Sequence, residues 1–178
     1  MTSAAVKALL LSIRPRYVAQ IIAGEKTVEL RRTRPRVPQG TRVLIYSTTP
    51  VQAIVAQTEI VQVLTGAPRQ LWRKVGGSSG VTRTELLEYL ANKDEAYALI
   101  LGRVQALPRP IGLEEVRKRW PSFRAPQSFR YVDWCPVGGT VLLPPGVVHV
   151  SAEPPRTGRK GRSTRQASSG RRTRANTN

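Results

Sequence analysis

The order of the short apolar segments limits the possible folds of this chain more than any other feature of its sequence. Residues 8–13 (ALLLSI) form an apolar run that is typical of a buried strand. Pro15, followed by apolar residues at helical spacing, predicts a helix that ends at Gly24. One helix then separates the first two strands, and the remaining strands mostly follow one another. This order favours an α+β barrel over a doubly wound parallel sheet.

The later segments are identified from alternating apolar residues and from turn residues between them. Further strands are expected over residues 26–32, 42–47, 53–64, 96–107, 128–132 and 140–143. Short peripheral helices are expected over residues 69–75, from Thr82 as N-cap with Glu85 to about Asn92, and over residues 113–120. The segment 53–64 is long enough to bend across a barrel. Gly102 is the expected position of a bulge or bend, and residues 76–80 (GGSSG) are expected to form a flexible loop.

The C-terminal segment 151–178 differs in composition from the rest of the chain. It contains no aromatic residue and almost no aliphatic one, and is built from Ser, Thr, Gly, Pro and Arg. Such a segment cannot bury enough apolar surface to offset the entropy that it would lose on ordering. We therefore expect a disordered basic tail and a folded part of at most residues 1–150, which is a common size for one domain.

The chain is strongly basic, with a formal net charge of +18. The tail holds eight basic residues and one acidic residue, so it accounts for +7 and the rest of the chain for +11. A domain this basic attracts polyanions such as nucleic acids. The alternative is a general preference for arginine, since 23 of the 29 basic residues are Arg. Charge alone does not separate RNA from DNA or from an acidic membrane.

The residue inventory excludes several classes of chemistry. His149 is the only histidine, Cys135 is the only cysteine, and the aspartates are Asp94 and Asp133, so neither a Ser-His-Asp triad nor a zinc cluster is expected. There is no glycine-rich phosphate loop. The N-terminus lacks a signal-peptide core, and no window approaches the ~20 apolar residues of a membrane span. We expect a cytoplasmic protein without a metal, a cofactor or membrane contact.

The segment GEKTVELRR, which begins at Gly24, concentrates residues that suit a ligand site. Lys26 offers a compact ammonium group, and Arg31 offers a planar fork for a phosphate or a base. Glu29 can accept from a base amino group, orient Arg31 or act as a general base. In a regular strand Lys26 faces away from Glu29 and Arg31, so the three converge only if Lys26 precedes the strand or a bulge intervenes. The alternative is a structural ion pair that holds the fold together.

This segment resembles the ASCH signature G-x-K-x-x-E-x-R, which matches Gly24, Lys26, Glu29 and Arg31. The segments 12–17 (SIRPRY), 45–47 (IYS) and 126–131 (PQSFRY) are also similar to segments of that family, in the same order. The resemblance covers about residues 7–132. It implies a PUA-like β-barrel with a cleft between the first helix and the sheet, which binds RNA or modified nucleosides. The expected domains are an ASCH/PUA-like domain over 1–132, a C-terminal extension over 133–150 and the tail over 151–178.

The same resemblance bears on whether the protein is an enzyme. Some ASCH relatives are amidohydrolases acting on acetylated cytidine, with the signature Lys and a Thr three residues later as nucleophile. Here Lys26 matches the Lys, but Glu29 stands at the Thr position and Thr27 points elsewhere, so a binding protein is expected in place of an amidase. The alternative is a hydrolase or ribonuclease acting on RNA or a modified nucleoside, with Lys26 and Glu29 as candidate catalytic residues beside Arg31. A third hypothesis is an adaptor whose tail docks on an acidic partner.

Five further residues are candidates for ligand contact. Arg14 and Arg16 lie at the start of the first helix, where positive charge is unfavourable unless an anion binds or solvent screens it. Tyr46 could stack on a base, or it could pack in the core. Ser128 and Arg130 could border the cleft. The expected partners are RNA or a nucleotide, with additional non-specific nucleic-acid binding through residues 151–178.

Overall fold

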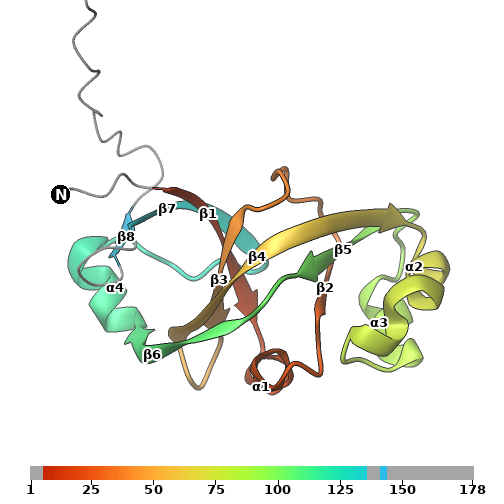
Figure 1. Cartoon of the computed structure of the whole chain (residues 1–178), viewed down its shortest axis with the longest axis horizontal. Coiled ribbons are helices and arrows are strands. Elements are labelled where there is room, and N and C mark those ends of the chain that lie inside the picture. Colours follow the sequence, from red (N-terminus) through yellow and green to blue (C-terminus); the bar gives the residue numbers. More distant parts are fainter. Residues whose placement is uncertain (1–5, 136–140, 144–178) are drawn as a thin grey trace, which may run out of the picture.

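A computed structural model describes residues 6–135 and 141–143 of the 178-residue chain (Figure 1). Its strands are β1 (Val6–Ile13), β2 (Val28–Arg31), β3 (Arg42–Ser47), β4 (Ala53–Gly66), β5 (Ala96–Leu101), β6 (Gln105–Gly112), β7 (Phe129–Cys135) and β8 (Val141–Leu143). Its helices are α1 (Pro15–Ala23), α2 (Pro68–Val75), α3 (Arg83–Tyr89) and α4 (Leu113–Arg119), together with a 3-10 turn, η1 (Gly76–Ser78). None of these helices is long and apolar enough to cross a membrane.

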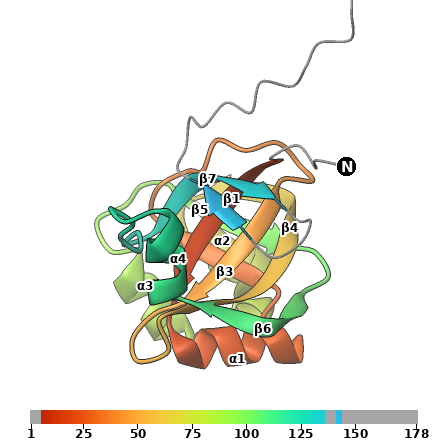
Figure 2. The same ribbon diagram turned by 90° about the vertical axis from the view of Figure 1, so that its left-hand side faces the viewer.

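The strands pair in the order β2-β5-β4-β3-β1-β7-β8, and β6 pairs with β4 beside this path. Strand β1 runs parallel to β3, and the other described pairs are antiparallel. The strands curve around a common interior, with α1 below them, α4 at one end and α2 and α3 at the other (Figures 1 and 2). The fold is therefore α+β, with one helix between the first two strands, as the sequence predicted, and the described strands form one curved sheet.

The long strand β4 is the centre of this arrangement. Its first half pairs with β3 on one side and with β6 on the other, and its second half pairs with β5. The register shifts at two points, between Ile54 and Ala56 against β6 and between Ile60 and Gln62 against β5. Such irregularities increase the local bend of a strand. The strand predicted over residues 53–64 is confirmed, and β4 extends two residues beyond the predicted end.

The strand predicted over residues 96–107 is wrong as a single element. The chain forms β5, leaves the sheet near Gly102, and re-enters it as β6 on the other half of β4. Gly102 donates its backbone N–H to the carbonyl of Glu59 at 2.9 Å, and a Cβ at this glycine would approach Glu59 Cγ to 2.8 Å. The bend expected at Gly102 is confirmed. Strand β6 has no partner but β4 among the described strands, so it tolerates Pro108 and Pro110.

Three clusters of buried apolar side chains hold the helices against the strands. One joins β1 and β3 to α4 through residues such as Leu10, Leu44 and Val116. The second packs α1, through Val18 and Ile21, on the other face of the same strands. The third packs α2 and α3 against β2 and β5. Because these clusters fix the helices against the strands, the ends of β1, α1, β2 and α3 meet in a defined geometry.

The boundaries of α1 and α3 follow from local signals. Helix α1 begins with Pro15 at its first position and ends at Gly24, whose φ of 79° is the left-handed conformation that glycine adopts without strain. At α3, the Thr82 hydroxyl accepts from the Glu85 N–H at 3.2 Å, and Glu85 accepts from the Thr82 N–H at 2.8 Å. Both predictions, the glycine cap and the capping box, are confirmed.

Strand β7 continues past residue 132 and pairs with β8 through residues 133–135 and 141–143. The predicted domain limits at 132 and 150 stay predictions. The remaining residues of the extension, 136–140 and 144–150, and the predicted tail 151–178 lie outside the described residues.

Candidate functional site

A cavity of about 660 Å³ lies where the ends of β1 and β2 meet α1 and α3. We call it the motif cavity, because the signature residues Lys26, Glu29 and Arg31 line it. The start of α1 contributes Arg14 and Arg16, and α3 contributes Glu85. Five of the predicted site residues are therefore brought together around one hollow.

Glu29 lies between Lys26 and Arg31 and bridges them. Its Oε2 is 3.1 Å from Lys26 Nζ, and its Oε1 is 2.9 Å from Arg31 Nη1. All three side chains are buried, and Lys26 is only 2% exposed. The convergence is possible because β2 begins at Val28, so Lys26 precedes the strand. For the three side chains to converge, Lys26 has to precede the strand or a bulge has to intervene. The first of these conditions is met.

Lys26 is fully occupied by protein acceptors. Besides Glu29, its ammonium donates to the backbone carbonyls of Val28 at 2.6 Å and Ser79 at 2.5 Å. An ammonium has three donors, so these contacts use all of them. Lys26 therefore orients Glu29 and anchors the segment that contains Ser79.

The anchored segment, residues 76–80, differs from the flexible loop that its composition predicts. Residues 76–78 form η1, Ser79 is fully buried, and its hydroxyl donates to the Gly76 carbonyl at 2.7 Å. Gly80 has a φ of 66°, and a Cβ there would approach Gln20 Oε1 to 2.5 Å. The segment is thus packed over Lys26, through tertiary contacts that composition does not reveal.

Arg31 and Ser12 carry the unsatisfied polar atoms of the cavity. Arg31 Nη2 donates to the Ser12 carbonyl at 3.1 Å, but Arg31 Nε has no hydrogen-bond partner within the described part of the chain. The Ser12 hydroxyl is likewise buried and without a partner there. Buried polar groups are usually hydrogen-bonded, so these two unpaired atoms in residues that line one cavity are exceptional.

The mouth of the cavity combines an aromatic ring with charges of both signs. The Arg16 guanidinium lies 4.4 Å from the centre of the Tyr17 ring, donates to the Tyr17 hydroxyl, and pairs with Glu85 at 3.0 Å. On the inner side, Lys26 Nζ is 5.5 Å from the same ring centre. The Thr82 backbone N–H lowers the pKa of Glu85; burial opposes this, and the Thr82 hydroxyl and Arg16 add to the lowering.

Four predicted site residues do not line this cavity. Gly24 caps α1. Tyr46 is buried in the cluster beside α4, where burial raises the pKa of its phenol and the charge of Arg117 opposes the rise. Its core position agrees with the packing alternative. Ser128 adjoins the cavity lining, because its carbonyl accepts from the Ser12 N–H at 3.1 Å.

Arg130 lies on the same side of the sheet as Tyr46, with its guanidinium 5.4 Å from the centre of the Trp120 ring. Ligand contact by Arg130, Ser128 and Tyr46 therefore stays a prediction, and the motif cavity does not include them.

Sequence reasoning missed several residues that line the cavity. Ser12 and Tyr17 lay within the family-like segment 12–17 but carried no assigned role, and Glu85 was noted only for its helix cap. Gln127 also lines the cavity, next to the closing strand. Within residues 6–135 and 141–143, no group of three or more His, Cys, Asp or Glu side chains is arranged to hold a metal ion. The cavity lining offers hydrogen-bonding groups, charges and two aromatic rings, those of Tyr17 and Tyr89.

The curved sheet and the bridged Lys-Glu-Arg cavity define an α+β domain of the ASCH class. The chain belongs to the ASCH domain family and to the family described as "Domain of unknown function (DUF365)", which matches residues 6–118.

The chain is similar to proteins from Zymomonas mobilis. It is 28% identical to an "ASCH domain-containing ribonuclease" of Zymomonas mobilis subsp. mobilis over 126 residues, which cover 71% of this chain and 84% of that protein. The crystal structure of ASCH from Zymomonas mobilis superposes with a TM-score of 0.67 at 27% identity, and covers 70% of this chain and 86% of that one. A serine-to-alanine variant of that protein matches with the same TM-score at 26% identity, over 74% and 90% of the two chains.

Proposed function

We propose that this protein binds RNA, or a nucleotide, in the motif cavity. The observation that carries the proposal is the pair of unpartnered buried groups, Arg31 Nε and Ser12 Oγ, in the lining of a cavity of about 660 Å³. A bound group with both acceptor and donor atoms, such as a nucleobase or a ribose, would satisfy them. The similarity to a protein named a ribonuclease also supports an RNA ligand.

The lining assigns a role to each group in this proposal. Arg31 is fixed by Glu29 and Ser12, so its guanidinium is held in one position in the cavity lining. The Tyr17 ring at the mouth offers a surface on which a base can stack. Arg14 is exposed at the start of α1 and would contact a phosphate. A bound anion there would also offset the unfavourable placement of Arg14 and Arg16 at the positive end of the helix dipole. Lys26 acts as a positioning residue.

The cleanest test is Ser12→Ala. The Ser12 hydroxyl makes no hydrogen bond with any described residue, so its removal should leave the midpoint of urea unfolding unchanged or slightly raised. Binding of a short labelled single-stranded RNA, or of adenosine or uridine monophosphate, should weaken about tenfold, the value of one hydrogen bond at ~1.4 kcal/mol. Fluorescence anisotropy and titration calorimetry measure the two ligand classes.

The matched control is Ser122→Ala, which alters an exposed serine outside the motif cavity. The Ser122 hydroxyl accepts from the Trp120 ring N–H at 3.0 Å, so this variant loses a hydrogen bond without altering the cavity. It should bind as the unaltered protein does. Equal binding by the unaltered protein and by Ser12→Ala, for RNA and for both nucleotides, would reject the motif cavity as the ligand site.

A second candidate function is RNA cleavage in the same cavity. The specific observation in its favour is the name of the relative, an ASCH domain-containing ribonuclease that this chain covers over 84% of its length. Glu29 is the candidate general base for removal of a proton from a ribose 2′-hydroxyl. Under this alternative, end-labelled RNA is cleaved by the unaltered protein, and Glu29→Gln loses cleavage while it retains binding. The absence of cleavage by the unaltered protein leaves the binding function alone.

A further inference from the structure

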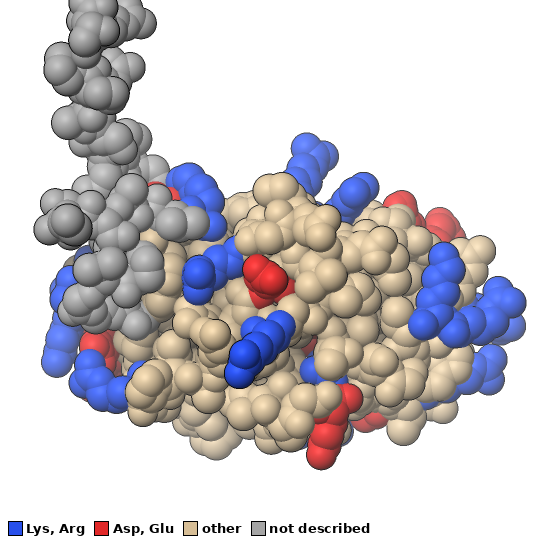
Figure 3. All heavy atoms as spheres, in the orientation of Figure 1, with Lys and Arg blue, Asp and Glu red and all other residues tan. Residues whose placement is uncertain are grey.

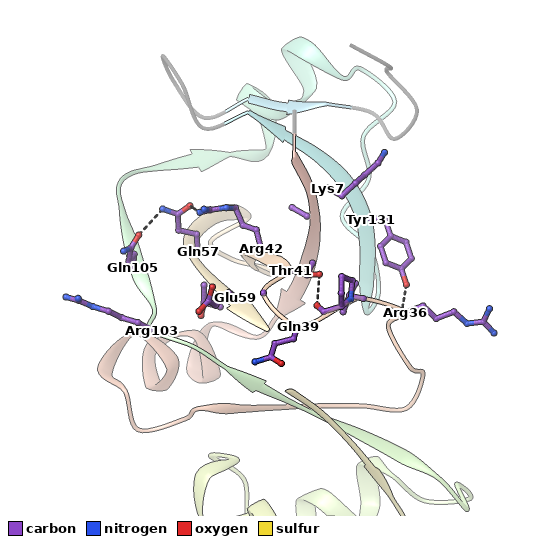
Figure 4. Close-up of a pocket in the computed structure, with 15 residues that line it drawn as sticks. Lys7, Arg36, Gln39, Thr41, Arg42, Gln57, Glu59, Arg103, Gln105 and Tyr131 are labelled. Carbon is purple, nitrogen blue, oxygen red and sulfur yellow. Dashed lines mark hydrogen bonds between the residues drawn. The ribbon is translucent and has the colours of Figure 1, made fainter. Parts of the chain in front are cut away.

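A second and larger hollow, of about 930 Å³, lies at the opposite end of β1 from the motif cavity (Figure 4). The starts of β1 and β3, the middle of β4 and the connection between β2 and β3 (residues 32–41) surround it. An adjoining hollow of about 860 Å³ lies along the same connection, and residues 36–38 line both. We call the two together the connection groove; it shares no lining residue with the motif cavity.

The connection groove is the more basic of the two sites. Its lining contains seven cations: Lys7, Arg32, Arg34, Arg36, Arg42, Lys93 and Arg103. Glu59 is its one acidic lining residue, whereas the motif cavity sets three acids against four cations. Basic side chains project from the rim of the molecule where this connection lies (Figure 3). A groove of this charge attracts a polyanion.

Most of these cations are not neutralised by the protein. Lys7 pairs with Asp133 at 2.6 Å, but no other lining cation forms an ion pair with a described acid. Arg42 donates to the Gln57 side chain at 2.7 Å, and Gln57 donates to Gln105 at 3.1 Å (Figure 4). These neutral amides orient Arg42 while leaving its charge available to a ligand.

The connection is held in a defined position, so the groove is formed in advance of binding. The backbone N–H of Arg36 donates to the Tyr131 hydroxyl at 2.8 Å. The Gly40 N–H donates to the Ile60 carbonyl at 2.7 Å, and the Ile60 N–H donates to the Thr41 carbonyl at 2.9 Å. Tyr131 remains 41% exposed, so its ring is accessible beside the cations. A preformed site loses less entropy when it binds its ligand.

We propose that the connection groove binds the backbone of a single-stranded nucleic acid. The cations are spread along two adjoining hollows, which suits a chain of phosphates better than one convergent phosphate. The exposed Tyr131 ring offers a stacking surface, and the amides of Gln57 and Gln105 can reach base edges only where the bases are unpaired. The proposal stands on this groove alone and does not depend on the motif cavity.

The test compares two double variants of the full chain that lose the same charge. Arg36→Gln/Arg103→Gln alters the groove at two exposed arginines, and Arg73→Gln/Arg124→Gln alters two exposed arginines outside it. Binding of a labelled oligouridylate of about 12 nucleotides is measured at several salt concentrations. The groove variant should bind at least about tenfold more weakly, with a salt slope flatter by about 1.4, or 0.7 for each phosphate that is no longer neutralised. The control should bind within about twofold of the unaltered protein.

Three results would overturn the proposal: equal loss of binding in the two double variants, unchanged binding by the groove variant, or equal affinity for a duplex of the same length. Displacement of the oligonucleotide by inorganic phosphate at comparable concentration would also overturn it, because the site would then hold a single anion. Ser12→Ala reports on the motif cavity in the same assay, so failure of one site is distinguishable from failure of the other.

The aromatic contact has its own pair of variants. Tyr131→Phe loses the hydroxyl that accepts from Arg36 but keeps the ring, whereas Tyr131→Leu loses both. If a base stacks there, binding falls about tenfold or more from Phe to Leu, since one base-aromatic stack is worth about that much. Equal affinity of the two variants would remove Tyr131 from the site.

Discussion

At the scale of the residue, the buried array of Lys26, Glu29 and Arg31 has a role in the fold, besides the ligand role that we propose for it. Sequence reasoning identified these residues and the condition for their convergence, because the bend before β2 follows from Gly24 and the start of the strand. It did not identify the acceptors that surround Lys26. Ser79 is 53 residues away in the sequence, and no local pattern connects the two.

Replacement of Lys26 by Met should therefore strongly destabilise the protein. The ammonium satisfies Glu29 and two backbone carbonyls, and breaking a buried ion pair by removal of one partner costs about 3–5 kcal/mol. Urea unfolding of the full chain measures the loss. The matched change at the exposed Lys118 should cost less than about 0.5 kcal/mol. Similar stability of the two variants would mean that the array is not structural.

Tyr46 shows a limit of prediction at this scale. Its type suits base stacking, yet the parallel pairing of β1 with β3 turns its side chain into the cluster beside α4. The face that a strand residue occupies depends on strand register, which is set by partners elsewhere in the chain. Residue type alone therefore could not distinguish the packing role from the stacking role.

At the scale of the element, local signals sufficed wherever one segment determines its own shape. The strand predicted over residues 42–47 is β3 residue for residue, and the glycine cap of α1 and the capping box of α3 are present. The division of residues 96–112 into β5 and β6 could not be predicted, since it reflects pairing with two halves of β4. The sequence indicated a bend at Gly102, but it did not indicate that the chain pairs with a different half of β4 after it.

The cap of α3 predicts a pH dependence of stability. The pKa of Glu85 is lowered in the folded protein, mainly by the Thr82 backbone N–H, so its carboxylate contributes stability above the ordinary Glu pKa of about 4.3. That contribution is lost as the pH falls through the lower folded pKa. Glu85→Gln should thus lower the urea midpoint at pH 6 and have a smaller effect at pH 3.

The matched control for this experiment is Glu88→Gln, an exposed residue of the same helix that forms no ion pair with the residues described. Its effect on the urea midpoint should be small at both pH values. The role assigned to the Glu85 charge would be contradicted if Glu85→Gln lowered the urea midpoint as much at pH 3 as at pH 6.

At the scale of the whole molecule, charge is distributed between the tail and the folded domain. We propose that residues 151–178 add nucleic-acid affinity without sequence preference, because they contribute eight basic residues in a short span. Removal of this segment should weaken binding of single-stranded RNA and flatten the salt slope by up to about 0.7 for each phosphate that the segment neutralises.

A chain that keeps the full length but has glutamine at those eight positions separates charge from length. It should bind like the truncated chain in the same salt titration. If the slope is unchanged by either alteration, the tail has no role in nucleic-acid binding, and the affinity resides in residues 1–150.

The 14-residue strand β4 has a practical consequence for work on this protein. It supplies Gln57 and Glu59 to the connection groove, and its partner β5 pairs with β2, the strand of the signature residues. A cut within residues 53–66 would therefore separate hydrogen-bonded partners on three neighbouring strands at once. The exposed turn at residues 49–52 is the better point of division. Two polypeptides that end and begin there keep β4 whole, and their reassembly would rebuild the motif cavity and the connection groove together.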